Sequence, residues 1–196
     1  MGLGKQHARA RLERVEALHA WQPTGTTIYV DDRVASTPTL PVIDAAAITA
    51  HAARLPATLQ LTLCTPLRIK AQGTYLQSVD LFALVQSLCW RLTALSIFHS
   101  DHPWTGDHQA LLDQARAIQV RSAQVQWWDW ERTSTRHATP RTMKLGGIVG
   151  TVVLDAVTSD LRALLVMGTL THIGKACVFG HGGYTVQPRA NQKELL

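Results

Sequence analysis

A glycine-rich segment near the end of the chain combines residue types that can hold a phosphate group. Its glycines are Gly174, Gly180, Gly182 and Gly183. Glycine permits positive φ angles and lacks a Cβ atom, so backbone N–H groups can approach an anion closely. Lys175 adds a point charge, and Tyr184 offers a ring on which a base can stack. We therefore expect a phosphate-binding loop; the alternative is a tight turn that feeds an edge strand.

Basic charge is concentrated in two short tracts of a chain whose net charge is +5. Residues 1–14 carry four basic residues against Glu13, and residues 121–144 carry five against Asp129 and Glu131, so each tract sums to +3. The basic residues toward the end of the second tract are Arg132, Arg136, Arg141 and Lys144. Such tracts predict a surface that binds a polyanion. The alternatives are a solvated loop and a solubilising N-terminus.

The elements that position these residues begin at residue 59. Leucines alternate with polar residues from Leu59 to Leu63, which predicts a half-buried strand, interrupted at Pro66 and resuming as far as Lys70. Apolar residues then recur at three- and four-residue steps as far as Phe98, which predicts a helix capped by Ser78. A second helix is expected to start at Asp107.

The second half of this region predicts a hairpin, a helix and a last strand. Strands are expected over 120–130 and 148–154, joined by a long charged tip over 132–144. Ser159 caps a helix that ends near Gly168, and the segment 171–183 leads into a strand over 184–186. The order is that of an RRM-like, ferredoxin-like βαββαβ domain. The predicted fold class is therefore α+β, with helices on one face of an antiparallel sheet.

The rest of the chain is less informative. Residues 1–58 are expected to form an N-terminal extension with a strand over 26–30 and a short helix capped by Asp44, and residues 188–196 a disordered tail. The tryptophans Trp127, Trp128 and Trp130 are expected to pack in the core rather than stack on bases. Because the three cysteines are far apart, reduced thiols in the cytoplasm are expected. The pattern predicts no metal site, no cofactor and no membrane span.

Three stretches in order resemble one known family. They are Leu63–Arg68, Trp127–Gly150 and His172–Tyr184. The last is close to GKGxxFGxGxY, the glycine-rich loop of RAMP proteins, and together the three resemble the C-terminal domain of CRISPR-associated precursor-RNA processing endoribonucleases. The resemblance covers roughly residues 59–187. Met1–Lys5 is similar to a glycine-rich turn midway along such proteins, so we expect a ferredoxin-like domain to be missing before it.

The resemblance implies that the chain binds CRISPR repeat RNA through the glycine-rich segment, including His181, and the charged hairpin. Together with a missing N-terminal half, it would cleave precursor RNA without a metal, by attack of a ribose 2′-hydroxyl that gives a 2′,3′-cyclic phosphate. His137 and His172 lie inside the resembling motifs and are the candidate acid and base. Alternatives are a non-catalytic RNA-binding subunit and a structural module. Other CRISPR-associated subunits or a second copy of the chain are the expected protein partners.

Overall fold

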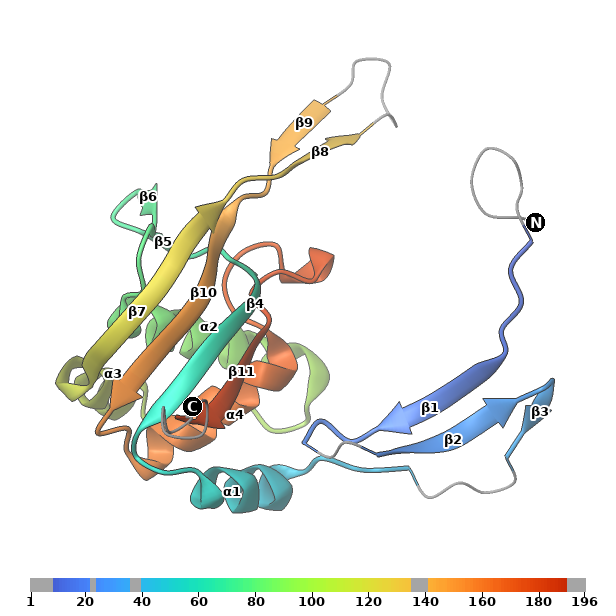
Figure 1. Ribbon diagram of the computed structural model, residues 1–196. Helices are drawn as coiled ribbons and strands as arrows, with labels where there is room; N and C mark the ends of the chain where they lie inside the picture. Colours follow the sequence, from blue (N-terminus) through green and yellow to red (C-terminus); the bar gives the residue numbers. More distant parts are fainter. Residues whose placement is uncertain (1–8, 22–23, 36–39, 135–140, 190–196) are drawn as a thin grey trace, which may run out of the picture. The chain divides into compact units, whose positions relative to one another are not determined.

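The computed structural model describes residues 9–21, 24–35, 40–134 and 141–189. The chain divides into two compact units, residues 1–47 and 48–196 (Figure 1). In the first unit, β1 (Arg14–Leu18), β2 (Gly25–Val30) and β3 (Arg33–Val34) form an antiparallel sheet in chain order. The strand predicted over 26–30 is therefore confirmed. Helix α1 (Ala45–Arg54) spans the division, and the Ala47 N–H donates to Asp44 Oδ1 at 2.8 Å, as the predicted cap requires.

The second unit is built on a four-stranded antiparallel sheet. Its strands, in the spatial order β11-β4-β10-β7, are β4 (Leu59–Leu67), β7 (Gln119–Trp128), β10 (Gly147–Asp155) and β11 (Tyr184–Pro188). The helices between them are α2 (Leu81–His99), α3 (His108–Ala117) and α4 (Ser159–Thr171). This order is the ferredoxin-like arrangement predicted from the sequence. Strand β4 continues through Pro66, contrary to expectation, because proline falls where the pairing with β10 shifts register and loses no ladder bond.

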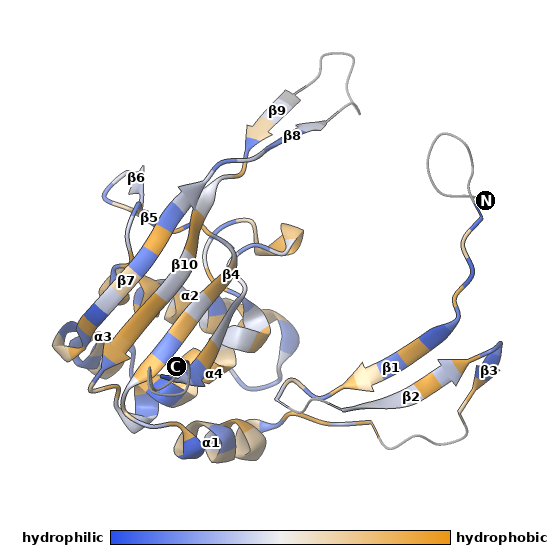
Figure 2. Ribbon diagram, viewed as in Figure 1, coloured by the Kyte–Doolittle hydropathy of each residue, from blue (hydrophilic) through white to orange (hydrophobic). Residues whose placement is uncertain are grey.

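The three helices cover one face of this sheet and close the core (Figures 1 and 2). Alternate residues of β4 point into it, and Leu59, Leu61 and Leu63 are almost completely buried. Leu84 and Leu88 of α2 are buried as well. Helix α2 is the one described helix long and apolar enough to cross a membrane, but its buried stripe faces the sheet. It is the core helix that the leucine spacing predicts.

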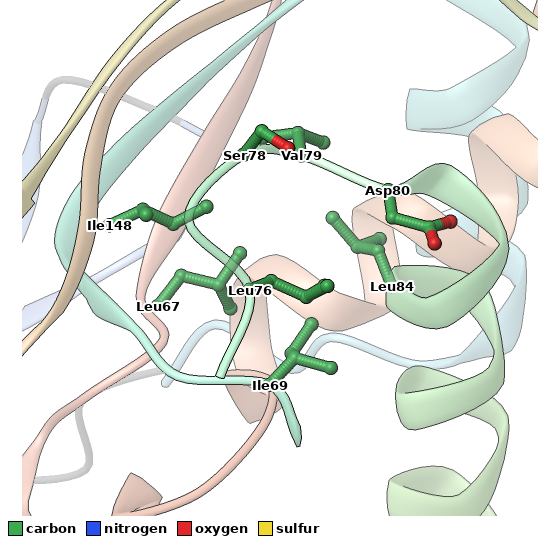
Figure 3. Close-up of a pocket in the computed structure, with 8 residues that line it drawn as sticks. All are labelled: Leu67, Ile69, Leu76, Ser78, Val79, Asp80, Leu84 and Ile148. Atoms are coloured by element: carbon green, nitrogen blue, oxygen red, sulfur yellow. The ribbon is translucent and has the colours of Figure 1, made fainter. Parts of the chain in front are cut away.

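A narrow crevice lies where the sheet ends and α2 begins (Figure 3). Leu67, Ile69, Leu76 and Ile148 face Leu84 across it, and the space between them has no room for a water-sized molecule. These side chains pack as part of the core. The polar residues at the edge of the crevice are Ser78 and Asp80, in the turn that leads into α2. The crevice is a feature of packing and not a ligand site.

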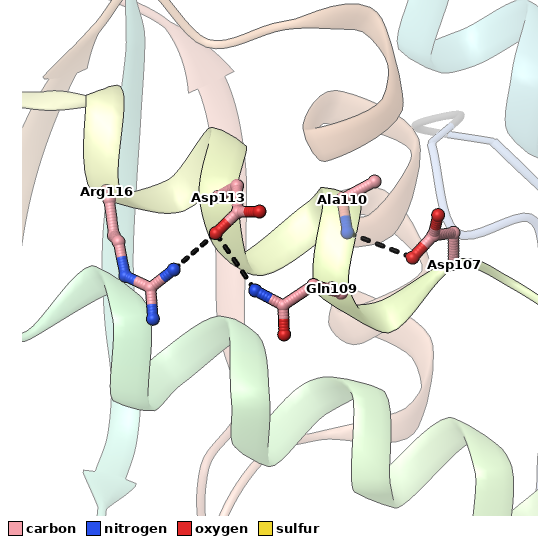
Figure 4. Close-up of polar contacts among 5 residues, drawn as sticks. All are labelled: Asp107, Gln109, Ala110, Asp113 and Arg116. Atoms are coloured by element: carbon pink, nitrogen blue, oxygen red, sulfur yellow. Dashed lines mark hydrogen bonds and ion pairs between the residues drawn. The ribbon is translucent and has the colours of Figure 1, made fainter.

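The caps of the helices are partly as predicted. Asp107 accepts the Ala110 N–H at 3.0 Å and starts α3, as expected (Figure 4). Helix α2, in contrast, is capped by Asp80 and not by Ser78, and α4 by Thr158 and not by Ser159. In both cases the residue immediately before the first helical turn provides the acceptor, where its side chain reaches the free N–H groups.

Three small elements project from the sheet region. Strands β5 (Lys70–Ala71) and β6 (Thr74–Tyr75) form a short hairpin after β4. Strands β8 (Glu131–Ser134) and β9 (Arg141–Lys144) extend the β7–β10 connection as a second hairpin, which confirms the predicted charged hairpin. A 3-10 turn, η1 (Cys177–Phe179), interrupts the glycine-rich segment.

Candidate nucleic-acid interface

The charged hairpin, described over Trp130–Ser134 and Arg141–Lys144, is in contact with the glycine loop, residues 172–183. The indole N–H of Trp130, just before β8, donates to Nε2 of His181 at 3.2 Å. The guanidinium of Arg132 lies 5.2 Å from the centre of the Phe179 ring. Two segments far apart in the sequence therefore form one surface, as a shared RNA-binding role requires.

The backbone of the glycine loop is bound to its own protein. The Lys175 N–H donates to the Arg68 carbonyl at 2.8 Å, and the Gly182 N–H to the Pro66 carbonyl at 3.1 Å. The Gly183 N–H donates to Thr65 Oγ at 2.8 Å. The N–H groups of Gly182 and Gly183 therefore hold the loop to the end of β4, and that of Gly180 donates to the Cys177 carbonyl, so the prediction that glycine N–H groups cradle a phosphate is wrong for these three glycines.

Backbone conformation and short contacts explain the glycines of this loop. Gly174, Gly180 and Gly182 have positive φ angles of 85°, 82° and 71°. A Cβ at Gly182 would lie 1.8 Å from the Ile173 carbonyl oxygen, and no substituent fits there. Gly183 has no positive φ, contrary to expectation, and an added Cβ would lie 3.1 Å from Thr65 Oγ1. Gly174 and Gly182 serve the close approach of one backbone to another, whereas Gly180 has open space around it and serves only its positive φ.

Tyr184 points away from the surface. Its side chain is buried, and its hydroxyl donates to the Leu165 carbonyl at 2.6 Å. The ring lies where Gly168 of α4 leaves room, since a Cβ there would meet the hydroxyl at 2.0 Å. Gly168 thus lies inside the helix and does not end it, contrary to expectation. Tyr184 cannot stack on a base, because the first residue of β11 faces the helices.

His181 is also turned inward. It is 3% exposed, its Nε2 accepts from Trp130, and Nδ1 is buried without a hydrogen-bond partner in the described part of the chain. Burial, with a smaller contribution from the Arg68 charge, lowers the pKa of His181. The imidazole is thus kept neutral, which does not suit the RNA-binding role predicted for it.

His172, in contrast, is partly exposed and has an unusual backbone. It follows α4 with φ 60° and ψ 169°, a region that essentially only glycine enters. Its Nδ1 lies 3.0 Å from the His181 carbonyl oxygen, so Nδ1 carries the hydrogen and Nε2 keeps its lone pair. The ring is therefore held with one nitrogen able to take a proton. His137, the other candidate, lies outside the described residues, as does Arg136.

An aromatic pocket of about 330 Å³ opens between the hairpin and the loop. Its walls are Thr65, Pro66, Trp128, Trp130, Phe179, Gly180 and His181. Trp128 is 55% exposed and Phe179 46%, so the expectation that the tryptophans pack in the core is wrong for Trp128. Both rings offer faces for stacking. The available signal is that Trp127 and Trp128 are adjacent in a strand, so that their side chains point to opposite faces and only one of them can face the helices.

Cations of the hairpin, the glycine loop and the end of β4 form no ion pair with a described carboxylate. Among described side chains, none forms an ion pair with Arg68, Arg132, Lys144 or Lys175. Arg68 donates to the Lys144 carbonyl, which ties the base of the hairpin to the end of β4. Arg141 begins β9, but its side chain lies outside the description. Unpaired cations near stacking surfaces form an electrostatic footprint for nucleic acid.

The sequence model of the family described as CRISPR-associated endoribonuclease Cas6 matches residues 61–184. The chain belongs to this family. No curated protein sequence matches it. Among solved structures, it superposes on the partial Cas6-RT-Cas1–Cas2 complex with a TM-score of 0.58 and 16% identity, over 85% of this chain and 29% of the other. Against a Thermus thermophilus Cas6 product complex, the TM-score is 0.54 at 14% identity.

That second superposition covers 84% of this chain and 64% of the Cas6 chain, so the chain spans less than two thirds of either protein. The likeness shows a shared fold.

One residue departs from the glycine pattern of the Cas6 family. Where GKGxxFGxGxY has its second glycine, this chain has Ala176. Its backbone is left-handed, with φ 67° and ψ 21°, so the local geometry is the one that glycine favours. The surrounding bonds, including Phe179 N–H to the Ala176 carbonyl at 2.8 Å, keep the turn in place. Ala176 therefore adopts the left-handed turn in this loop without being a glycine.

Proposed function

We propose that this chain binds the repeat RNA of CRISPR precursor transcripts on the surface formed by the charged hairpin and the glycine loop. The observation that carries the proposal is the contact between the two segments, through Trp130 with His181 and Arg132 with Phe179. Their junction is an aromatic pocket flanked by cations that have no acidic partner among the described side chains. Membership of the Cas6 family supports RNA as the ligand.

Side chains, and not the loop backbone, make the contacts in this proposal. Arg132 and Lys144 hold phosphates from the hairpin, and Lys175 and Arg68 hold them from the glycine loop and the end of β4. An unpaired base stacks on Trp128 and Phe179. If four phosphates are neutralised, the logarithm of the affinity falls with the logarithm of salt concentration with a slope of roughly −3.

We propose further that His172 takes part in cleavage by a metal-independent route. Its Nε2 accepts the proton of a ribose 2′-hydroxyl, the 2′-oxygen attacks phosphorus, and the 5′-oxygen leaves with a proton from an acid. The products are a 2′,3′-cyclic phosphate and a 5′-hydroxyl. His137 is the candidate acid. The strained backbone of His172 supports this role, because such strain gathers where a side chain must be held for function.

A non-catalytic RNA-binding subunit is the second candidate. What favours it is the inward position of His181, which leaves His172 without a second histidine at the described surface of the loop. In either role, the partners that we propose are RNA and other CRISPR proteins. The Cas6-RT-Cas1–Cas2 complex supports this, since there a Cas6 domain is assembled with Cas1 and Cas2.

The test uses end-labelled repeat stem–loop RNA with EDTA present, and measures binding on filters and cleavage on gels. Trp128→Ala should weaken binding by about 1–3 kcal/mol for the loss of one stacked base. His172→Gln should retain binding and reduce cleavage by about 10²- to 10⁴-fold. Arg54→Ala, an exposed cation at the end of α1, is the control and should change neither.

The results separate the two candidates. Binding without cleavage by the wild-type chain supports the subunit. If Trp128→Ala binds RNA as the wild type does and salt has no effect on affinity, the interface is wrong.

A further inference from the structure

A second cleft, of about 610 Å³, is lined in part by the glycine loop. It is bordered by the first half of α2, by the segment Arg68–Gln72 that includes β5, and by Gly174 and Lys175 of the loop. It shares no lining residue with the aromatic pocket. The two openings are thus lined by different residues of the glycine loop, and the second includes Arg68 and Lys175 of the interface proposed above.

The cleft is strongly basic. Arg68, Lys70, Arg91 and Lys175 line it, against the single carboxylate of Asp80. That carboxylate caps α2 by accepting the Ala83 N–H at 3.1 Å. Within the described ranges, none of the four cations has an ion-pair partner. An accumulation of unpaired positive charge in a concave site attracts a polyanion.

Two of these cations are held in place by the protein. Arg91 Nε donates to the Thr171 carbonyl at 3.0 Å, which fixes the guanidinium at the end of α4. Arg68 stacks over the Tyr75 ring at 4.1 Å, and its Nε is buried with no hydrogen-bond partner in the described chain. Guanidinium groups that are fixed before binding lose less entropy when they bind phosphate.

The cleft also contains an exposed aromatic ring. Trp90 is 63% exposed, although it lies on the core helix and its neighbours Leu88 and Cys89 are buried. The Phe82 ring, in contrast, is covered by the guanidinium of Arg116 at 4.5 Å. A basic groove that contains an open tryptophan is the combination that binds single-stranded nucleic acid, with phosphates on the cations and a base on the ring.

We infer that this cleft binds a single-stranded segment of RNA that continues from the RNA held at the hairpin and glycine loop. Lys175 connects the two sites, since it belongs to the loop that borders both. The inference rests on the proposed function for its RNA, but it assigns a separate surface. A duplex does not suit it, because stacking on Trp90 requires an unpaired base.

The experiment compares a repeat stem–loop with the same stem–loop carrying a single-stranded oligouridine extension at either end. The wild-type chain should bind one extended RNA at least about fivefold more tightly than the stem–loop, since one stacked base alone supplies this factor. Trp90→Ala and Lys70→Ala should remove the advantage and leave binding of the bare stem–loop unchanged. Phe98→Ala, 79% exposed at the end of α2, is the aromatic control and Arg54→Ala the charge control.

Each outcome decides one of the two proposals. If neither extension tightens binding, or if Trp90→Ala behaves as Phe98→Ala does, the cleft assignment is wrong while the hairpin interface stands. If polyglutamate competes as well as oligouridine, the cleft recognises charge alone and the assignment to RNA also fails. If oligouridine binds with dependence on Trp90 while the stem–loop does not bind, the cleft stands and the proposed function fails.

Discussion

Glycine at position 172 should make the protein more stable than alanine does, which reverses the order found inside a helix. His172 has φ 60° and ψ 169°. For a residue with a Cβ atom, this region costs about 1–3 kcal/mol. The cost is sustained by neighbouring bonds, including the His172 N–H to the Gly168 carbonyl at 2.9 Å. Any variant that keeps a Cβ keeps the strain.

The two variants differ in how they change the folding free energy. Both lose the hydrogen bond from Nδ1 to the His181 carbonyl, worth about 0.5–1.5 kcal/mol. Only His172→Gly also removes the strain. Glycine gives the unfolded chain more freedom than alanine, which costs about 0.4–1 kcal/mol. The difference leaves His172→Gly more stable than His172→Ala by about 1–2 kcal/mol.

Urea unfolding followed by tryptophan fluorescence measures both free energies of unfolding. The matched control is Thr171, the last residue of α4 with ordinary helical geometry. There Thr171→Ala should be more stable than Thr171→Gly by up to about 1 kcal/mol. If His172→Ala equals or exceeds His172→Gly in stability, the backbone at this position is not strained. The strain argument for a catalytic His172 would then fall with it.

Three further predictions concern the loop and the thiols. Gly182→Ala should lower the free energy of unfolding by about 3 kcal/mol or more, because its Cβ clashes with backbone. Gly180→Ala, whose Cβ has open space, should cost only about 1–2 kcal/mol, for its positive φ. Equal losses of stability in urea unfolding would contradict this reasoning. In a timed alkylation of the native chain, exposed Cys64 should react first and Cys89 last, because burial raises the pKa of Cys89 to about 11; simultaneous reaction would show that the core opens. Since burial lowers the pKa of His181 in the folded chain, protons bind the unfolded chain preferentially below about pH 6.5, and stability should fall as pH drops through that value. The melting temperature of His181→Gln should fall less with decreasing pH than that of the wild type. If both fall by the same amount, His181 is not the cause.

The sheet and its helices could be predicted because their signals are local. Alternation from Leu59 to Leu63 fixes which side of β4 is buried, and leucine spacing does the same for α2. The capping residues were harder to predict. Ser78 and Asp80, for example, both offer a side-chain acceptor and lie only two positions apart. The sequence supplies the chemistry of a cap but not the turn at which the helix begins.

The candidate site was predictable in its segments but not in the direction of its side chains. Neighbouring tryptophans end β7, so alternation alone could not say that Trp128 is the outward one. The glycine motif that Tyr184 ends suggests a surface position for its ring. As the first residue of β11, however, Tyr184 points its side chain toward α4, where it lies beside Gly168. Which face of a strand is covered depends on partners far along the chain, and no local pattern contains that information.

The hydrogen bonds of the glycine loop change how its role should be understood. Its N–H groups bind Arg68, Pro66 and Thr65, so the loop functions as a brace across the end of β4. These bonds also position side chains. The hydrogen bond from the Lys175 N–H to the Arg68 carbonyl keeps these two cationic residues close together, although they are far apart in sequence. In the proposed function, phosphates are therefore bound by charged side chains and not by the bonded N–H groups of the loop. Replacing Lys175 should therefore weaken RNA binding without disturbing the loop, because its structural contribution is its backbone N–H, which any residue except proline supplies.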